Sequence, residues 1–350
     1  FLDNDGSPEN RAETASVLGD LVNDQPESLV KLVLNSQPSQ YIRLAPVLKN
    51  LGTSGQSALE STYSKALATE QEPLDVRVES RRRKGAAAIA LLEFRQTGPL
   101  MAVLSAIEDP DLTHQAEYRL SQLNAHSEIL FDLLPSADTV LRASLLRCLT
   151  GMKYGDIPEP LRNSITDEAK QLFVSDKDTG VHSAAEWLLR SWGQKDQIAE
   201  LLKQESVPHQ YTPDKDWYVN ADGQSMAVFR NVGTVRTGSP EGEEDRDRDE
   251  VQVLRTVNRD FAISTKEITM EELTRRYPNY RHADTLVNPT RDCPAVAMTW
   301  YMAAEYCYYL SLEEDIPEDQ MCYTYDPNGF PVIAADYLHR TGYRLPTEAE

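Results

Sequence analysis

Apolar residues recur at helical spacing through the first two hundred residues of the chain. Residues 1–206 contain a succession of one-sided apolar stripes, and none of them alternates convincingly as a β-strand would. One stripe comprises Leu100, Val103, Leu104 and Ile107, and it follows Pro99 at a first-turn position where the missing N–H costs nothing. Because each stripe covers one face of its helix, each helix needs a neighbour. The pattern predicts an all-α region over residues 1–206.

Acidic turns precede several of these stripes. Asp109-Pro110-Asp111, Asp138 and Asp176-Lys177-Asp178 each stand before a helical segment with small residues on its packing face and leucines further along. Acidic side chains cap helix N-termini, and small residues let neighbouring helices approach closely. We therefore predict HEAT-like helical repeats, which stack into a solenoid with a concave surface for a protein partner. Because the spacing of the repeats is irregular, a compact irregular helical bundle is the alternative.

A polar segment follows the helical region. Residues 207–216 contain Pro208 and Pro213 and few apolar residues, which is typical of a linker. We therefore expect a multidomain chain, with the all-α region over residues 1–206 and a second domain over residues 217–350.

Strand-like runs mark the second domain. Residues 217–220 and 226–229 predict two strands around a turn at Asp222-Gly223. Further on, Thr269 and Glu272 have the T-x-x-E spacing of a capping box, in which each side chain accepts a hydrogen bond from the other residue's backbone N–H. These patterns predict an α+β domain.

The last residues contain a second capping box. Pro346 disfavours helix at the residue before it, and Thr347 and Glu350 again have the T-x-x-E spacing. We expect a helix to begin here, and the sequence stops within its first turn. Because the chain also opens with Phe1 rather than Met, we expect a fragment that is cut or processed at both ends.

Residues 343–350 read Tyr-Arg-Leu-Pro-Thr-Glu-Ala-Glu, which resembles the central signature of the formylglycine-generating enzyme family, the sulfatase-modifying factors. The resemblance extends in the same order to three earlier blocks, at residues 235–241, 261–269 and 293–307. It covers residues 217–350, which we interpret as the N-terminal half of a family domain that is cut at its end.

The resemblance implies a fold, an activity and two metals. The family fold is compact, has little regular secondary structure, is related to the C-type lectin fold and binds calcium. In complete members two late cysteines bind copper(I) and activate oxygen, which converts a cysteine of a sulfatase peptide into formylglycine. No residue of this chain matches those cysteines. Copper and calcium are therefore implied for the complete domain alone, and we assign no catalytic, cofactor-binding or metal-ligating residue here.

Two classes of function stay open. In the first, the parent protein is a copper-dependent oxidoreductase that modifies a sulfatase-like protein, and the helical repeats bind partners. In the second, the domain is a non-catalytic binding module of a multidomain signalling or scaffold protein, because a fold does not fix a function. Val235, Thr237 and Met302 differ from the family's usual residues. These differences leave the predicted fold intact and weaken the case for activity.

The cysteines and histidines give little sign of a metal site. Cys148, Cys293, Cys307 and Cys322 contain no C-x-x-C pair. Cys307 is expected to be a small buried hydrophobe in a helix, whereas Cys293 and Cys322 lie beside turns and could pair. The compartment stays open, with the cytoplasm favoured.

The histidines of the helical region do not cluster at ligand spacing, and we expect surface or satisfied helical positions for His114, His126, His182 and His209. His126-Ser127-Glu128 resembles half of the H-x-x-x-H-x-E iron motif of the ergothioneine sulfoxide synthases, which join a helical iron-binding domain to the same C-terminal fold. Gln122 replaces its first histidine, so the motif is broken.

Composition narrows the range of partners. The 350 residues are 40% hydrophobic, which suffices for a core in each domain, and the formal net charge is −21. A chain this acidic repels nucleic acids and anionic membranes, so we expect a protein or peptide partner. The basic run Arg81-Arg82-Arg83-Lys84 is most simply a solvated helix face, and no apolar run is long enough to span a membrane.

Overall fold

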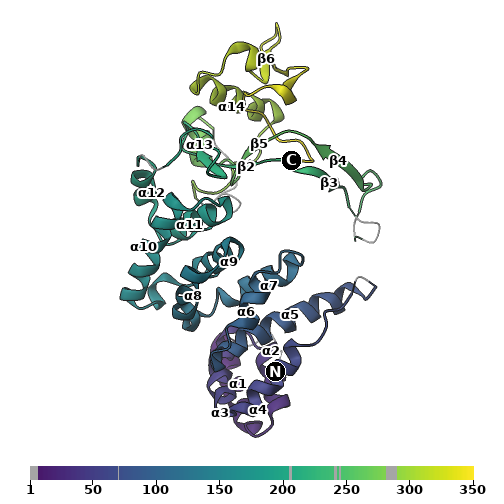
Figure 1. Cartoon of the computed structure of the whole chain (residues 1–350), viewed down its shortest axis with the longest axis vertical. Coiled ribbons are helices and arrows are strands. Elements are labelled where there is room, and N and C mark those ends of the chain that lie inside the picture. The colour runs from purple at the N-terminus through teal and green to yellow at the C-terminus, as the bar shows by residue number, and fades with distance from the viewer. Residues whose placement is uncertain (1–6, 70, 205–206, 240–242, 244–245, 281–289) are drawn as a thin grey trace. The chain divides into compact units, whose positions relative to one another are not determined.

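The computed structural model describes residues 7–69, 71–204, 207–239, 243, 246–280 and 290–350 (Figure 1). The chain divides into two compact units, Phe1–Leu201 and Leu202–Glu350, which we call the helical unit and the mixed unit. In the described residues the helical unit contains helices and no strand, whereas the mixed unit contains short strands and helices. The prediction of an α-helical region followed by an α+β region is confirmed.

The helical unit is built from helices that pack on their near neighbours in sequence. Helices α5, α7, α9 and α11 contact one another in turn, and α10 packs on α11. The helices are α1 (Pro8–Leu21), α2 (Pro26–Asn35), α3 (Pro38–Asn50), α4 (Thr53–Tyr63), α5 (Leu74–Ala90), α6 (Gly98–Leu104), α7 (Pro110–Leu120), α8 (Ser127–Leu133), α9 (Thr139–Thr150), α10 (Glu159–Ser175), α11 (Thr179–Ser191) and α12 (Lys195–Leu201), with a 3-10 helix η1 (Leu91–Phe94) after α5. No helix in the described residues is both long and apolar enough to cross a bilayer.

The predicted acidic caps form. Asp109 accepts a hydrogen bond from the backbone N–H of the residue three positions on, and so do Asp138 and Asp178. Each carboxylate satisfies one of the N–H groups that a helix leaves unpaired at its start. Leu100, Val103 and Leu104 of the predicted stripe are buried, whereas Ile107 is exposed because α6 ends at Leu104.

The basic run in α5 differs from its prediction as a solvated face. Arg81 Nε lies 2.8 Å from Asp109 Oδ1, and 20% of each side chain is exposed. Arg82 Nη1 donates to Leu34 O at 2.8 Å, which satisfies a carbonyl near the end of α2. The arginines join α5 to its neighbours because their long apolar stems lie along the surface while the guanidinium groups reach polar partners.

The mixed unit contains three small antiparallel sheets. Strand β2 lies between β1 and β5, β3 pairs with β4, and β6 pairs with β7. The elements are β1 (Trp217–Val219), β2 (Ser225–Phe229), β3 (Gly233–Thr237), β4 (Val253–Val257), β5 (Phe261–Ser264), α13 (Met270–Arg276), α14 (Trp300–Glu313), β6 (Tyr323–Tyr325) and β7 (Pro331–Ile333). The predicted strand pair around Gly223 is confirmed, and Gly223 has the positive φ of +81° that its turn requires.

The hydrogen bonds of both predicted capping boxes form, although residues 347–350 make a turn and not the predicted helix. Thr269 and Glu272 form the predicted capping box of α13. Thr347 N donates to Glu350 Oε2 at 2.9 Å and Glu350 N donates to Thr347 Oγ1 at 3.4 Å, so the second predicted box forms too. Thr299 caps α14.

Residues 207–216, which were predicted to be a linker, belong to the mixed unit by their contacts. Val207 is buried, and Val219 N donates to Pro208 O at 2.8 Å. In the matched block 235–241, Val235 and Thr237 lie in β3, while residues 240–241 fall outside the described residues.

Close backbone contact fixes the segment that carries the family signature. Gly342 N donates to Gln320 O at 3.0 Å. A Cβ atom added at Gly342 would lie 2.8 Å from that oxygen, so only glycine fits without a shift of the backbone. Tyr343 and Leu345 then pack against the buried cluster of Ala304, Cys307, Cys322 and Tyr323.

Candidate functional site

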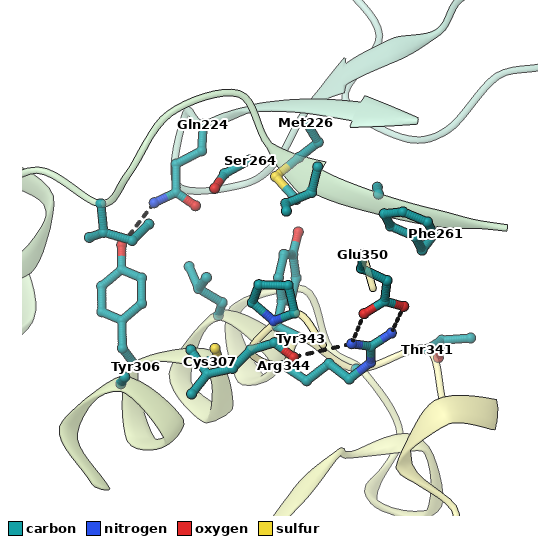
Figure 2. A pocket seen from close by; sticks show the side chains of 18 of the residues that line it. Gln224, Met226, Phe261, Ser264, Tyr306, Cys307, Thr341, Tyr343, Arg344 and Glu350 are labelled. Atoms are coloured by element: carbon teal, nitrogen blue, oxygen red, sulfur yellow. Dashed lines mark hydrogen bonds and ion pairs between the residues drawn. The ribbon is translucent and has the colours of Figure 1, made fainter. Parts of the chain in front are cut away.

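A cavity of about 730 Å³ lies inside the mixed unit, within the size range of small-ligand and peptide-side-chain pockets (Figure 2). Met226 of β2 and Ile263 of β5 line one side. Cys307 and Leu310 of α14 line another, and Leu338 together with residues 340–346 completes the wall. The middle of the cavity is therefore largely apolar, which favours burial of an apolar group there.

One end of the cavity is a chain of hydrogen bonds. Gln224 Nε2 donates to Tyr306 OH at 2.9 Å, and Tyr306 OH donates to Asp222 Oδ2 at 3.0 Å. Asn220 Nδ2 donates to Gln224 Oε1 at 2.8 Å, which fixes the orientation of the Gln224 amide. Burial, followed by the nearby Asp222 carboxylate, raises the pKa of Tyr306. The phenol therefore stays protonated and keeps its role as a donor.

Tyr343 of the signature segment extends this polar end. Its hydroxyl donates to Glu314 Oε1 at 2.9 Å, and its backbone N–H donates to Ser311 Oγ at 2.8 Å. The same Glu314 oxygen accepts from Ala221 N at 3.0 Å. Burial is the largest cause of the raised pKa of Tyr343. Helix α14, the β1–β2 turn and the signature segment are therefore joined through one carboxylate.

The opposite end of the cavity holds the buried carboxylate of Glu350, which faces Arg344 in Figure 2 and also pairs with Arg259. Glu350 Oε1 lies 2.6 Å from Arg344 Nη2 and 2.7 Å from Arg259 Nη2, and 1% of its side chain is exposed. Burial alone would raise the pKa of Glu350, but hydrogen bonds from Arg344, Thr347 and Arg259 lower it to about 2. Glu350 is ionised at neutral pH, and the three groups together carry one positive charge.

Strand β5 borders the cavity along an edge that no described strand covers. Residues Phe261 to Ser264 all line the cavity, and β5 pairs only with β2 among the described strands. Thr265 N donates to Ser225 O, and in an antiparallel ladder only every second residue bonds to its partner strand. Ala262 and Ser264 therefore direct their backbone N–H and C=O groups away from β2. This leaves an edge that can pair with an added strand.

None of the four cysteines was assigned to the copper site that the resemblance implies, and the structure shows where each one lies. All four are free thiols, so Cys293 and Cys322 are not paired. Cys307 is buried in α14 as predicted, and burial raises its pKa to about 12. Burial also raises the pKa of Cys322, whose Sγ donates to Gly342 O at 3.1 Å. Both thiols therefore hold their protons at neutral pH.

The side chains that commonly bind metals are scattered in the part of the chain that the structure describes. No group of three or more His, Cys, Asp or Glu side chains gathers there at metal-binding distances. Among the histidines, His114 and His209 are exposed, whereas His126 and His182 are buried. His182 Nδ1 lies 2.7 Å from Phe173 O, and His126 Nε2 lies 3.6 Å from Glu93 Oε1. The buried histidines therefore face different partners and do not converge.

Comparison of the chain with protein-family models, curated proteins and solved structures finds no match. The function proposed below therefore depends on the geometry of the cavity and on the residues that carry the resemblance.

No residue of the cavity was predicted from the sequence, because residues that meet in the cavity are far apart along the chain. Gln224 and Tyr306 are 82 residues apart in the sequence, and Arg259 and Glu350 are 91 residues apart. No local pattern predicts such pairs. The one available signal is the resemblance itself, because the matched blocks contribute β5, α14 and the segment around Tyr343 to the same cavity.

Proposed function

We propose that the mixed unit binds an extended peptide segment of a partner protein. The peptide adds as a strand to the free edge of β5 and places side chains in the adjoining cavity. The observation that carries this proposal is the outward direction of the backbone groups of Ala262 and Ser264, at an edge that borders the cavity. In strand addition, main-chain hydrogen bonds supply affinity and side-chain pockets supply specificity.

The composition of the cavity supports a peptide as the ligand. Its apolar middle, between Met226 and Leu310, accepts an aliphatic or aromatic side chain. Its polar ends offer oriented donors and acceptors, with Gln224 and Tyr306 at one end and the guanidinium of Arg344 at the other. A few polar groups around an apolar centre are typical of sites that orient a ligand.

We also propose that residues 217–350 belong to a domain of the formylglycine-generating enzyme type, related to the C-type lectin fold. The support is that three matched blocks, distant in sequence, line one cavity: residues 261–264, Cys307 with its neighbours in α14, and residues 343–346. Oxidation of a sulfatase cysteine to formylglycine is the activity that this assignment implies. Since no residue of this chain matches the family's copper-binding cysteines, we derive no oxidation step here, and the open edge of β5 favours the binding module.

For the helical unit we propose a HEAT-like scaffold that binds a protein partner. The support is the succession of contacts among α5, α7, α9 and α11, which is the arrangement expected when helical hairpins stack. Such a scaffold offers a surface separate from the β5 edge.

The peptide-binding proposal is tested by selecting binders from a random octapeptide library displayed on phage, with the full chain as bait. Ala262→Pro removes an outward N–H that β2 does not use, so it should weaken the selected peptides at least roughly tenfold. Ala262→Val keeps the N–H and serves as the matched control. Selected peptides that bind Ala262→Pro as well as wild type, or no selected peptide at all, would contradict the proposal.

The same peptides separate binding from oxidation. Each selected sequence is resynthesised with a central cysteine and with serine in its place. We expect equal affinity for the pair, because no described group in the cavity is specific for a thiol. A strong preference for cysteine would favour the oxidoreductase.

A further inference from the structure

Helix α14 carries aromatic residues on a face that lies away from the cavity. Tyr301, Glu305, Tyr309 and Leu312 follow one another at helical spacing, and 52% of Tyr301 and 48% of Leu312 are exposed. Phe330, which is 54% exposed, lies beside Tyr301 with ring centroids 5.4 Å apart. Large aromatic groups on a surface mark interaction sites when they gather in one place.

Glu305 lies at the centre of this face and is held by phenol groups. Tyr277 OH donates to Glu305 Oε2 at 2.6 Å, and Tyr309 OH lies 3.4 Å from Glu305 Oε1. Tyr325 of β6 lies close enough for Glu305 to contribute to its raised pKa. These tyrosines come from the end of α13, from α14 and from β6, so three elements meet near one carboxylate.

The rings around this carboxylate stand at steep angles to one another. Tyr308 and Tyr325 have centroids 4.9 Å apart and an interplanar angle of 84°, and Tyr308 and Tyr309 stand at 69°. Burial comes first and Glu305 second among the causes that raise the pKa of Tyr325 to about 12. The phenols therefore remain neutral at physiological pH and offer ring faces that attract a cation.

Among the described residues, the carboxylate of Glu305 takes part in no salt bridge, whereas the nearby carboxylates of Asp222 and Glu313 do. Arg276 pairs instead with Glu313 and lies near Asp222. The carboxylate supplies a negative charge, and the faces of the neighbouring aromatic rings attract cations through their quadrupoles. Its chemistry is complementary to a positively charged group.

We propose that Glu305, Tyr277, Tyr309 and Tyr325 bind a lysine or arginine side chain of a partner protein. The site is separate from the β5 edge and does not depend on the peptide proposed to bind there. The occupant is a basic protein segment because the site combines an uncompensated carboxylate with aromatic faces, and because the net charge of −21 attracts cationic chains.

The test is calorimetric titration of the full chain with tetralysine, with tetraglutamate as the charge control. Glu305→Gln keeps the size and the acceptor oxygen but removes the charge, so it should weaken tetralysine roughly fivefold. Glu318→Gln changes the net charge equally at an exposed position in the α14–β6 connection, so it should change the affinity less than twofold. Equal effects of the two variants would show nonspecific attraction and overturn the proposal.

Two tyrosine variants test the rings independently of Glu305. Tyr325→Leu should weaken tetralysine roughly threefold because it removes a ring face, whereas Tyr309→Phe keeps its ring and should stay within twofold of wild type. Unchanged binding by Tyr325→Leu would contradict the proposal. A wild-type dimer in sedimentation that Tyr325→Leu converts to a monomer would show that a second copy covers this face, and would also overturn it.

Discussion

The helical and mixed units are stabilised by different kinds of contact. The helical unit buries leucine and alanine from neighbouring helices and places its acidic side chains at helix starts. The mixed unit buries tyrosines such as Tyr306 and Tyr323, and the Tyr306 hydroxyl reaches a partner far away in the sequence. The first unit therefore depends mainly on apolar contacts between sequence neighbours, whereas the second depends on long-range polar contacts. This difference leaves polar groups and an open strand edge for recognition in the mixed unit.

The largest expected effect is the loss of an apolar contact in the helical unit. Leu188 of α11 is fully buried, so Leu188→Ala should lower the free energy of unfolding of this unit by about 3 kcal/mol. Urea unfolding monitored by circular dichroism at 222 nm measures the change. The control is Leu21→Ala in α1, where 68% of the side chain is exposed and the cost should be small. Equal costs at the two positions would contradict the described core.

Loss of the buried Glu350 carboxylate should have the next largest effect, which is a lower stability of the mixed unit. Glu350→Gln leaves Arg259 and Arg344 without their ionised partner, which should cost on the order of 2 kcal/mol. Because the folded-state pKa of Glu350 is lowered from 4.5 to about 2, its stabilisation is present above pH 4.5 and is lost as the pH falls toward 2. Hydrogen exchange of residues 217–350 at several pH values measures this loss. An unchanged acid profile in Glu350→Gln would refute the assignment.

A helix cap should contribute less. Asp178 Oδ1 accepts from Val181 N at 3.0 Å at the start of α11, so Asp178→Ala should destabilise the helical unit by about 1 kcal/mol. Asp178→Asn keeps the acceptor and should recover most of the loss, as measured by thermal unfolding. If both variants unfold at the wild-type temperature, the cap contributes nothing.

The smallest predicted effect is a pH dependence in the helical unit. Burial lowers the pKa of His126, although the neighbouring Glu93 carboxylate opposes this shift. The folded state therefore binds a proton at His126 less readily than the unfolded state does. The stability that the neutral His126 contributes is lost as the pH falls below about 6.5. The free energy of unfolding should be measured for wild type and for His126→Gln at pH values between about 7.5 and about 5.5. It should decrease with falling pH in wild type alone. Parallel slopes would assign the effect to other groups.

Local patterns predicted much of the helical unit and little of the site. Asp109 and Asp138 were recognised as caps because a cap needs only a few adjacent residues. The β3–β4 and β6–β7 pairs were not predicted, although Val251, Val253 and Val257 give part of a strand's alternation. Their pairing is set by tertiary contacts that local propensity does not encode.

The cavity was beyond sequence reasoning for the same reason. Glu350 was recognised as a capping residue, and its hydrogen bond from Thr347 N is confirmed. Its ion pairs with Arg259 and Arg344 join positions that no short motif relates. The open edge of β5 could not be predicted either, because it depends on which strands pair with it.

Hydrogen exchange on the full chain, with and without a library-selected octapeptide, tests the central claim most directly. The account predicts that the amides of Ala262 and Ser264 exchange readily in the free chain and become protected on binding, while the core of the helical unit keeps its exchange rates. Protection confined to the helical unit, with exchange at Ala262 and Ser264 unchanged, would contradict strand addition at β5.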